Sequence, residues 1–277
     1  MVVFPNAKIN LGLRVVQKRT DGFHDIETIF YPIALYDVLE VISDVDNRAT
    51  GAKDISYSGI PFPLTSDDLC LRAYNLLKKE FPKLPQVKMH LHKAVPMGAG
   101  LGGGSADASF TLKALNVLFN LALTDEQLLH YSLQLGSDCP FFIINKPAYA
   151  TGRGDILEPV ELDLTPYKFV VINPGIHVNT AGAFAQVVPG ATTKTVKEIA
   201  GEPIETWKNM LQNDFEKFIF QTYPEIKAIK QQLYDGGAIY ASMSGSGSTV
   251  YGIFEKKITV QLNMPAHYHV YELISQF

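Results

Sequence analysis

Cysteine, long apolar runs and an excess of basic residues are all scarce in this sequence. Two cysteines, Cys70 and Cys139, are too few for a disulfide framework or a four-cysteine zinc site. No uninterrupted apolar run reaches the roughly 18 residues of a membrane-spanning helix. The net charge of −4 argues against a nucleic-acid or membrane-surface partner. The first residues also lack the charged-then-apolar layout of a signal peptide, so we expect a soluble, cytoplasmic protein.

The composition is that of a folded globular protein. Apolar residues make up 47% of the 277 residues and charged residues 19%, which excludes disorder, collagen and coiled coil. A chain of this length forms one large domain or two medium ones. It also buries enough surface for a stable core without covalent cross-links.

Apolar periodicity predicts a mixture of strands and helices that do not alternate strictly, so the predicted fold class is α+β. Turn-forming residues at 152–155 place a soft boundary there, giving an N-terminal lobe over 1–152 and a C-terminal lobe over 153–277. The predicted strands cover residues 2–16, 23–30, 37–42, 87–91, 141–144, 168–172, 239–242, 249–254 and 267–271. The predicted helices cover residues 66–80, 105–120, 125–136, 180–187, 205–220 and 224–234. The strand over 2–16 alternates as a half-buried strand does, and Asp21-Gly22 predicts a hairpin turn after it. Ser66 is the expected N-cap of the helix over 66–80, and Thr124 to Gln127 form a capping box that opens the helix over 125–136.

A glycine-rich loop that runs into a helix is the strongest chemical signal. Small residues let backbone amides approach an anion closely, and a helix N-terminus adds free N–H groups and partial positive charge. This combination predicts a phosphate-binding site, although a flexible surface loop has a similar composition. The candidate residues are Pro96, Met97, Gly98, Ala99, Gly100, Leu101, Gly102, Gly103, Gly104, Ser105 and Ala106.

The loop does not match the common nucleotide-binding motifs. Gly98, Gly100 and Gly103 fit G-x-G-x-x-G, but the preceding strand is predicted to end at Leu91, too early for a dinucleotide fingerprint. A P-loop requires a lysine before the serine, and Gly104 stands there instead. We therefore expect a phosphate cradle of another type, with a dinucleotide-dependent oxidoreductase as an alternative.

Two charged residues outside the loop are candidates for catalysis. Lys8 and Asn10 lie on one face of the first strand, where the lysine is either functional or simply solvated. Asp138 precedes the apolar run 141–144 and is either a turn or capping residue or a general base held by the rigid elements around it.

Two further patterns are open to a structural interpretation. Residues 242–249 have the composition of a linker, but their position between two predicted strands equally favours a tight turn. His90 and His92 share one strand face without a third ligand nearby, so we do not expect a metal site there.

Taken together, five segments resemble motifs of the GHMP small-molecule kinase superfamily and occur in the same order as in that family. They are Pro5–Leu11 (PNAKINL), Arg19–Asp25 (RTDGFHD), Pro96–Ala106 (PMGAGLGGGSA), Leu135–Phe141 (LGSDCPF) and Ser244–Ser248 (SGSGS). The resemblance covers nearly the whole chain and implies a two-lobed α+β fold, with ATP mainly on the N-terminal lobe and with the C-terminal lobe contributing to a substrate site between the lobes. It also implies ATP-dependent phosphorylation of the 2-hydroxyl of a cytidine-diphosphate-linked methylerythritol.

The resemblance assigns roles to particular residues. Asp138 would accept the hydroxyl proton, and Lys8 would lie beside it and stabilise the developing oxyanion. Residues 96–106 would wrap the ATP phosphates, with Ser105 reaching Mg²⁺. The residues that would bind the substrate are Asn10, Phe23, His24 and Phe184; His24 would read the cytosine edge and Phe184 would stack on its face.

The sequence departs from the family pattern at a few positions. Phe23 replaces a tyrosine and Ser137 an alanine, which leaves the chemistry intact. Another GHMP kinase, of the homoserine or mevalonate type, and a catalytically silent regulator of the same fold are the alternatives. Lys8 and Asp138 are both present, which favours an active enzyme.

Overall fold

A computed structural model describes residues 1–44, 55–62, 68–190 and 193–277. These residues form two compact units. The first unit contains residues 1–7, 35–97 and 102–145, and the second contains residues 8–34, 98–101 and 146–277. The chain thus passes between the units several times, whereas the lobes expected from the sequence divide it once, after residue 152. The expected lobes concern ATP and substrate binding and stay a prediction.

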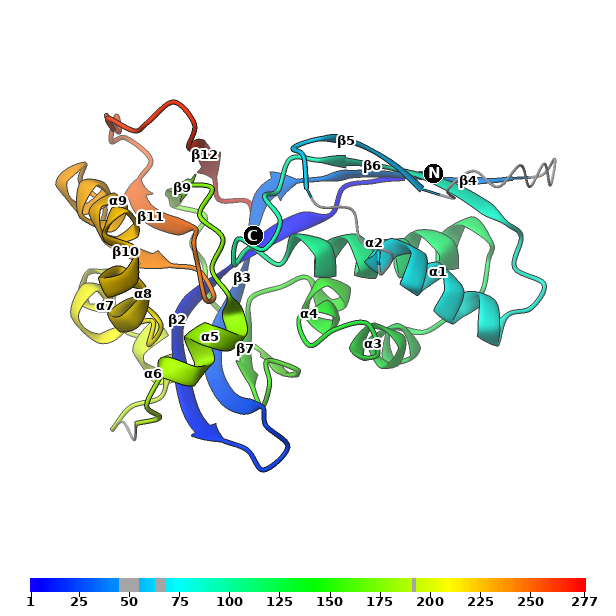
Figure 1. Ribbon diagram of the computed structural model, residues 1–277, viewed down its shortest axis with the longest axis horizontal. Helices are drawn as coiled ribbons and strands as arrows, with labels where there is room; N and C mark the ends of the chain where they lie inside the picture. Colours follow the sequence, from blue (N-terminus) through cyan, green and yellow to red (C-terminus); the bar gives the residue numbers. More distant parts are fainter. Residues whose placement is uncertain (45–54, 63–67, 191–192) are drawn as a thin grey trace. The chain divides into compact units, whose positions relative to one another are not determined.

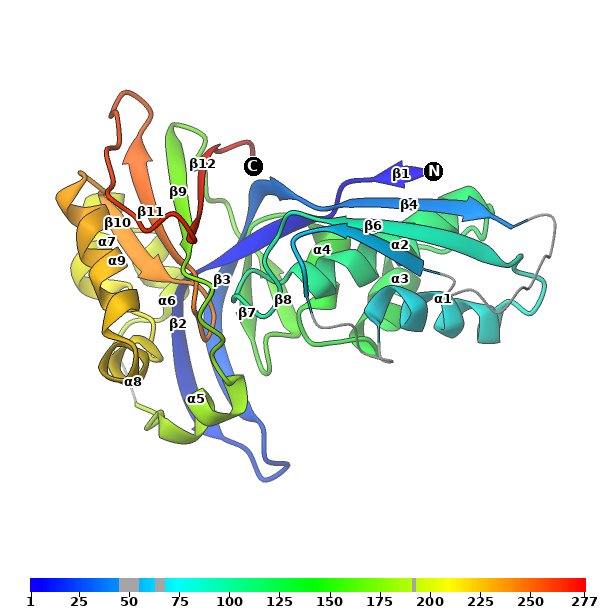
Figure 2. The ribbon, with the colours of Figure 1, turned by 45° about the horizontal axis from the view of Figure 1, so that its top comes forward.

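The first unit is an antiparallel-rich sheet with helices packed on one face (Figures 1 and 2). Its strand order is β1-β4-β6-β5, with β5 parallel to β6. The core lies between this sheet and α1–α4, where apolar residues such as Val41, Leu91 and Leu112 are buried. The elements are β1 (Val2–Val3), β4 (Val38–Ser43), β5 (Ile55–Gly59), α1 (Leu69–Glu80), β6 (Val87–Lys93), α2 (Gly103–Leu118), α3 (Asp125–Leu133) and α4 (Cys139–Ile144).

The second unit holds two further sheets, with strand orders β2-β3-β7-β8 and β10-β11-β9-β12. Helices α8 and α9 pack their apolar residues, including Ile219, Ile229 and Leu233, against the second of these sheets. The strands are β2 (Asn6–Lys18), β3 (His24–Tyr36), β7 (Ala148–Thr151), β8 (Ile156–Pro159), β9 (Tyr167–Asn173), β10 (Tyr240–Met243), β11 (Val250–Glu255) and β12 (His269–Ile274). The helices are α5 (Thr180–Gln186), α6 (Val196–Ala200), α7 (Ile204–Met210), α8 (Glu216–Thr222) and α9 (Pro224–Asp235).

Local sequence signals explain several element boundaries. The predicted capping box at Thr124 is confirmed, because its side chain accepts from the Gln127 N–H and the Gln127 side chain accepts from the Thr124 N–H. The β2–β3 hairpin turns at the predicted Asp21-Gly22, with Gly22 at φ +87°. Helix α1 is capped by Asp68, whereas the expected cap Ser66 lies outside the described residues.

Three expectations about secondary structure were wrong. Residues 141–144 form the helix α4 and not a strand, and Pro140 stands in its first turn, where proline is compatible with a helix. The helix expected over 205–220 is two helices, α7 and α8, separated by Leu211–Phe215. Strand β2 was expected to be half-buried, but both of its faces are buried from Asn6 to Leu13. Among the described residues, no helix has both the length and the apolar character of a membrane span.

Candidate active site

Lys8 and Asn10 are buried in strand β2, which excludes the interpretation of Lys8 as a solvated surface lysine. Their side chains are 3% and 2% exposed. The Lys8 ammonium donates to Asn10 Oδ1 at 2.7 Å and lies 4.7 Å from the centre of the Phe30 ring. Asn10 Nδ2 in turn donates to Thr28 Oγ1 on the neighbouring strand. A buried cation held by an amide oxygen and an aromatic face is fixed in position, as a catalytic group must be.

Residues 98–101 of the glycine-rich loop belong to the same unit as this strand, and Leu101 contacts it. The Lys8 backbone N–H donates to the Leu101 carbonyl at 2.9 Å. Gly98, Gly100 and Gly102 all have positive φ angles, between +62° and +80°, while Ala99 and Leu101 between them do not. Such alternation of backbone conformation turns successive N–H groups toward one side, and this arrangement binds anions. This backbone pattern supports the phosphate-cradle interpretation, which stays a prediction.

Gly100 is the most constrained residue of the loop. A Cβ atom on Gly100 would lie 2.0 Å from the Ser244 carbonyl oxygen, and its φ of +80° is strained for any L side chain. The Ser244 hydroxyl donates to the Gly100 carbonyl at 2.8 Å. Residues 244–249 are the turn between β10 and β11, so the tight-turn alternative is confirmed and the linker interpretation is wrong.

Helix α2 follows the loop in the first unit. Its N-cap, Gly102, has no side chain with which to cap the first N–H groups. These N–H groups, at Gly103, Gly104 and Ser105, are donors that an anion can use. Gly103 also has a packing role. A Cβ atom there would lie 3.0 Å from Val95 and 3.4 Å from Lys93 Nζ, so Gly103 allows close packing of the helix on its own unit.

Asp138 occupies the N-cap position of α4 and is half-buried. It lies in a turn, as one alternative predicted, but its side chain makes no capping hydrogen bond to that helix. Helix α4 is bound to α2 through Ser109, whose hydroxyl donates to the Cys139 carbonyl at 2.8 Å. These contacts hold Asp138 on rigid helical elements beside the N-terminal part of α2.

Cys139 next to Asp138 is a buried structural thiol. Burial raises the pKa of Cys139 to about 11, so at neutral pH it carries no thiolate that could act as a nucleophile. Hydrogen bonding with Ser105 and Ser109 opposes this rise only in part. The thiol lies against the N-terminal turn of α2 and contributes packing there.

The two residues expected to recognise a cytosine lie in contact. The rings of His24 and Phe184 are stacked, with centres 5.0 Å apart and an interplanar angle of 19°. Phe184 also packs edge-on against Phe215 at 4.8 Å. Phe23 is 53% exposed, and the Arg153 guanidinium lies 5.0 Å from the centre of its ring. The second unit therefore presents an aromatic cluster, with one face of Phe184 covered by His24.

A buried ionic cluster beneath α2 was not expected from the sequence. Lys93, the last residue of β6, forms ion pairs with Asp37 and with Asp107 of α2. Asp37 also accepts the N–H groups of Ala94 and Val95, where the chain leaves the sheet for the glycine-rich loop. The cluster therefore holds together the strand that precedes the loop and the helix that follows it. The available signal was Lys93 itself, which continues the inward-facing alternation of Val87, Met89 and Leu91.

The ionisation of this cluster is perturbed. Burial raises the pKa of Asp107 to about 8, an effect that the nearby Lys93 ammonium offsets only in part. Burial alone would lower the pKa of Lys93, but Asp107 and Asp37 outweigh it and raise the pKa. Within the described residues, Asp107 Oδ1 is buried without a hydrogen-bond partner. With a proton on Asp107, the cluster would contain the Lys93 cation and the Asp37 carboxylate and would have no net charge.

The comparisons with known proteins agree with this arrangement. Residues 68–146 match the model of the GHMP kinases N terminal domain, and residues 195–270 match that of the GHMP kinases C terminal. A solved mevalonate kinase of Methanococcus jannaschii, 12% identical, has a similar fold with a TM-score of 0.67 over 100% of this chain and 98% of that chain. The expected GHMP kinase family is confirmed, and the chain belongs to the GHMP kinases. The role of the glycine-rich loop in ATP binding stays a prediction.

Closer relatives specify the branch. A 4-diphosphocytidyl-2-C-methyl-D-erythritol kinase of Azobacteroides pseudotrichonymphae is 54% identical over 92% of this chain and 94% of its own length. One of Bacteroides fragilis is 50% identical over 94% of both. A crystal structure titled 4-(cytidine 5'-diphospho)-2C-methyl-D-erythritol kinase is 32% identical, with a TM-score of 0.77 over 91% of this chain and 90% of that chain. Within the GHMP kinases, the chain belongs to the 4-diphosphocytidyl-2-C-methyl-D-erythritol kinase family.

Replacing Asp107 by asparagine should change how stability depends on pH. A carboxyl whose pKa is about 8 in the folded protein and 3.8 ordinarily binds more protons in the folded state between these values. The free energy of unfolding of the wild type therefore falls as the pH rises from about 4 to 8. Urea unfolding at several pH values should show a shallower fall for Asp107→Asn over this range.

Asp37→Asn is the matched control for this change. Because Asp37 accepts two backbone N–H groups and pairs with Lys93, its replacement should destabilise the protein at every pH. Parallel stability curves for the wild type and Asp107→Asn would contradict the perturbed ionisation of Asp107.

Replacing Gly100 by alanine should destabilise the loop far more than the same change at Gly98. Both residues have positive φ, which costs an L residue about 1–2 kcal/mol. The nearest atom to a Cβ on Gly98 is 3.7 Å away, whereas on Gly100 the Cβ would collide with backbone. Chemical unfolding should show the larger loss for Gly100→Ala, and equal losses would exclude the close approach to Ser244.

Proposed function

We propose that the protein transfers the γ-phosphoryl group of ATP to the 2-hydroxyl of a cytidine-diphosphate-linked methylerythritol, in the non-mevalonate route to isoprenoid precursors. The observation that carries the reaction class is the glycine-rich loop, whose alternating φ angles lead into the uncapped N-terminus of α2. The acceptor is inferred from the near full-length relatives of that name and is supported by the stacked His24 and Phe184.

The reaction follows from the roles of a few side chains. Asp138 accepts the proton of the substrate 2-hydroxyl, and the oxygen of that hydroxyl attacks the γ-phosphorus of ATP. The bond from the γ-phosphorus to the β–γ bridging oxygen breaks, and ADP is released. The Lys8 ammonium stabilises negative charge at the acceptor oxygen. Asn10 accepts a hydrogen bond from Lys8, which fixes the direction of this ammonium, and we propose that Asn10 also helps to orient the acceptor.

The phosphate groups would be held mainly by backbone. N–H groups of residues 98–105 would bind the β- and γ-phosphate oxygens, which needs no basic side chain in the loop. Ser105 at the start of α2 supplies a hydroxyl oxygen of the hard type that Mg²⁺ prefers. The described residues contain no group of three or more acidic, histidine or cysteine side chains that could hold a metal ion. Magnesium would therefore be bound largely by the ATP phosphates and water, and would neutralise phosphate charge.

Cytosine recognition would require a change at the aromatic cluster. His24 covers one face of Phe184. A cytosine that stacks on that face must displace the imidazole, which could then hydrogen-bond to the edge of the base. Phe23 beside His24 is exposed and supplies a second ring. A magnesium requirement and a cytoplasmic location complete the proposal.

Phosphorus NMR of the purified protein with ATP and magnesium tests this function. The acceptors are the cytidine-diphosphate-linked methylerythritol, methylerythritol phosphate, mevalonate and homoserine. We expect a new phosphomonoester signal with the first acceptor alone. Turnover of mevalonate or homoserine at a comparable rate would contradict the acceptor, and no turnover of any would contradict the kinase activity.

Replacing Asp138 by asparagine should remove the proton acceptor while preserving the shape of the side chain. Loss of a general base typically lowers the rate by about 10²–10⁴-fold. Ser137→Ala is the matched control, because it makes a small change at the adjacent position. Steady-state kinetics should show reduced kcat for Asp138→Asn only, and wild-type kcat in the folded variant would disprove the assignment.

Replacing Phe184 by alanine should weaken cytidine binding. Stacking on an aromatic ring contributes roughly 1–3 kcal/mol per base, or about 5- to 150-fold in Kd. Phe184→Leu keeps an apolar side chain against Phe215 without the flat ring, so it should also weaken binding. Calorimetry with cytidine 5'-diphosphate measures the effect, and ATP affinity should stay unchanged. Retention of cytidine 5'-diphosphate affinity in the leucine variant would show that ring stacking is not used.

A further inference from the structure

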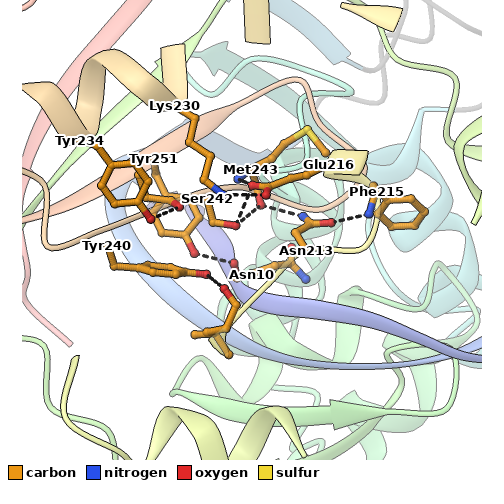
Figure 3. A network of polar contacts seen from close by, with 12 residues as sticks. Asn10, Asn213, Phe215, Glu216, Lys230, Tyr234, Tyr240, Ser242, Met243 and Tyr251 are labelled. Carbon is orange, nitrogen blue, oxygen red and sulfur yellow. Dashed lines mark hydrogen bonds and ion pairs between the residues drawn. The ribbon is translucent and has the colours of Figure 1, made fainter. Parts of the chain in front are cut away.

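A buried amide lies between the catalytic strand and the turn that supports the glycine-rich loop (Figure 3). Asn213 stands in the segment between α7 and α8 and is 3% exposed. Its Nδ2 donates one hydrogen bond to the Met243 carbonyl and one to the Gly245 carbonyl, both at 2.8 Å. Its Oδ1 accepts the Phe215 N–H at 3.0 Å. The three contacts use both amide hydrogens and fix which end of the amide faces the turn.

The backbone on either side of Asn213 is bound to strand β2. Gln212 accepts the Leu13 N–H through its carbonyl, and the Asp214 N–H donates to the Leu13 carbonyl, both at 2.9 Å. The Asp214 carboxylate also accepts the Val15 N–H at 2.8 Å. The segment is therefore fixed to the same strand that carries Lys8 and Asn10, and Asn213 reaches from there to the β10–β11 turn.

Glu216, the first residue of α8, binds Met243 from its N–H side. Glu216 Oε1 accepts the Met243 N–H at 2.8 Å and the Ser242 hydroxyl at 3.2 Å. Its Oε2 pairs with Lys230 at 2.6 Å (Figure 3). Met243 is thus held by Glu216 at its N–H and by Asn213 at its carbonyl, directly before the turn begins.

Ser244 transmits this constraint to the loop. It lies between the two carbonyls that Asn213 binds. Its hydroxyl donates to the Gly100 carbonyl at 2.8 Å and accepts the Asn10 N–H at 3.2 Å. The turn and the loop are also in direct contact, since a Cβ on Gly245 would lie 3.2 Å from the Gly100 Cα. A shift of Ser244 would therefore move the backbone at Gly100, in the middle of the alternating φ pattern.

We propose that Asn213 is a positioning residue for phosphate binding, acting through Ser244 on the glycine-rich loop. The inference rests on the proposed function, because it assigns ATP phosphates to that loop. Asn213 touches no reacting atom. Its amide fixes the conformation of the β10–β11 turn, and Ser244 of that turn fixes the position of the Gly100 carbonyl. The loop N–H groups face the phosphates only when that carbonyl is in place.

Asn213→Asp tests the proposal with almost no change in shape. The carboxylate can still accept the Phe215 N–H, but its second oxygen would face the Met243 and Gly245 carbonyl oxygens and repel them. We expect Kd for ATP to rise about tenfold or more, the scale of one lost buried hydrogen bond. The affinity for cytidine 5'-diphosphate should stay within about twofold of the wild type. Ser244→Ala should raise Kd for ATP as well, and the double variant should show less than the product of the two effects.

Tyr240→Phe separates positioning from general destabilisation. The Tyr240 hydroxyl is buried and donates to the Leu211 carbonyl at 2.9 Å, in the same segment but away from the turn. Its loss should lower Tm without changing ATP affinity. Calorimetry with a nonhydrolysable ATP analogue and with cytidine 5'-diphosphate, together with Tm, is measured for all variants.

Each outcome decides the proposal. Weaker ATP binding in Asn213→Asp and Ser244→Ala, but not in Tyr240→Phe, supports it. A lower Tm with unchanged ATP affinity in Asn213→Asp overturns it and leaves a purely structural role. If Asn213→Asp does not fold, Ser244→Ala decides, and its unchanged ATP affinity overturns the proposal. If the wild type binds no ATP, the proposed function is overturned as well. If the wild type and all the variants bind ATP with the same affinity, only this inference is overturned.

Discussion

The close approach of Gly100 to Ser244 is the constraint on which the rest of the site depends. With 2.0 Å between a hypothetical Cβ and the Ser244 carbonyl oxygen, no other residue fits at position 100 while the turn stays in place. The contact lets an all-backbone surface, with positive φ at Gly98, Gly100 and Gly102, keep one conformation despite its glycine content. Flexible glycines would otherwise cost binding energy when a ligand orders them.

The remaining parts of the site are held by buried polar contacts. Lys8 is held by Asn10 and Phe30 in the second unit, and Lys93 by Asp37 and Asp107 in the first. Such groups are costly to bury and contribute little net stability, but they permit only one arrangement of their partners. For phosphoryl transfer, where proteins contribute mainly charge and alignment, this rigidity is the useful property. Membership of a kinase family and the local geometry thus both point to a site that needs charged groups in fixed positions.

Much of this could be predicted from the sequence where the signal is local. The capping box at Thr124, the turn at Gly22 and the glycine-rich loop depend on residues a few positions apart, so their patterns are visible in one segment. The positions of Lys8, Asn10 and Asp138 in the chain make them candidates, the resemblance assigns their roles, and these roles stay predictions. The strand predicted over 141–144 is part of the short helix Cys139–Ile144, because a run of four apolar residues has no measurable period.

Tertiary contacts explain what could not be predicted. Asn213 sits inside a stretch with helical periodicity, and the break there follows from its bonds to strand β2 and the β10–β11 turn, which lie about 200 and 30 residues away. Asp107 differs in no local way from a surface residue of a helix, and the alternation that places Lys93 on the inward face of β6 does not reveal its partners. Only the packing of α2 on β6 shows that they are buried together.

Crystal structures of the protein alone and with a nonhydrolysable ATP analogue test the preformed loop most directly. We expect Gly98, Gly100 and Gly102 to keep positive φ in both structures, with the Ser244 hydroxyl donating to the Gly100 carbonyl. We also expect phosphate oxygens within hydrogen-bonding distance of N–H groups of residues 98–105. A loop that rearranges when the nucleotide binds, or phosphates bound elsewhere, would contradict these expectations.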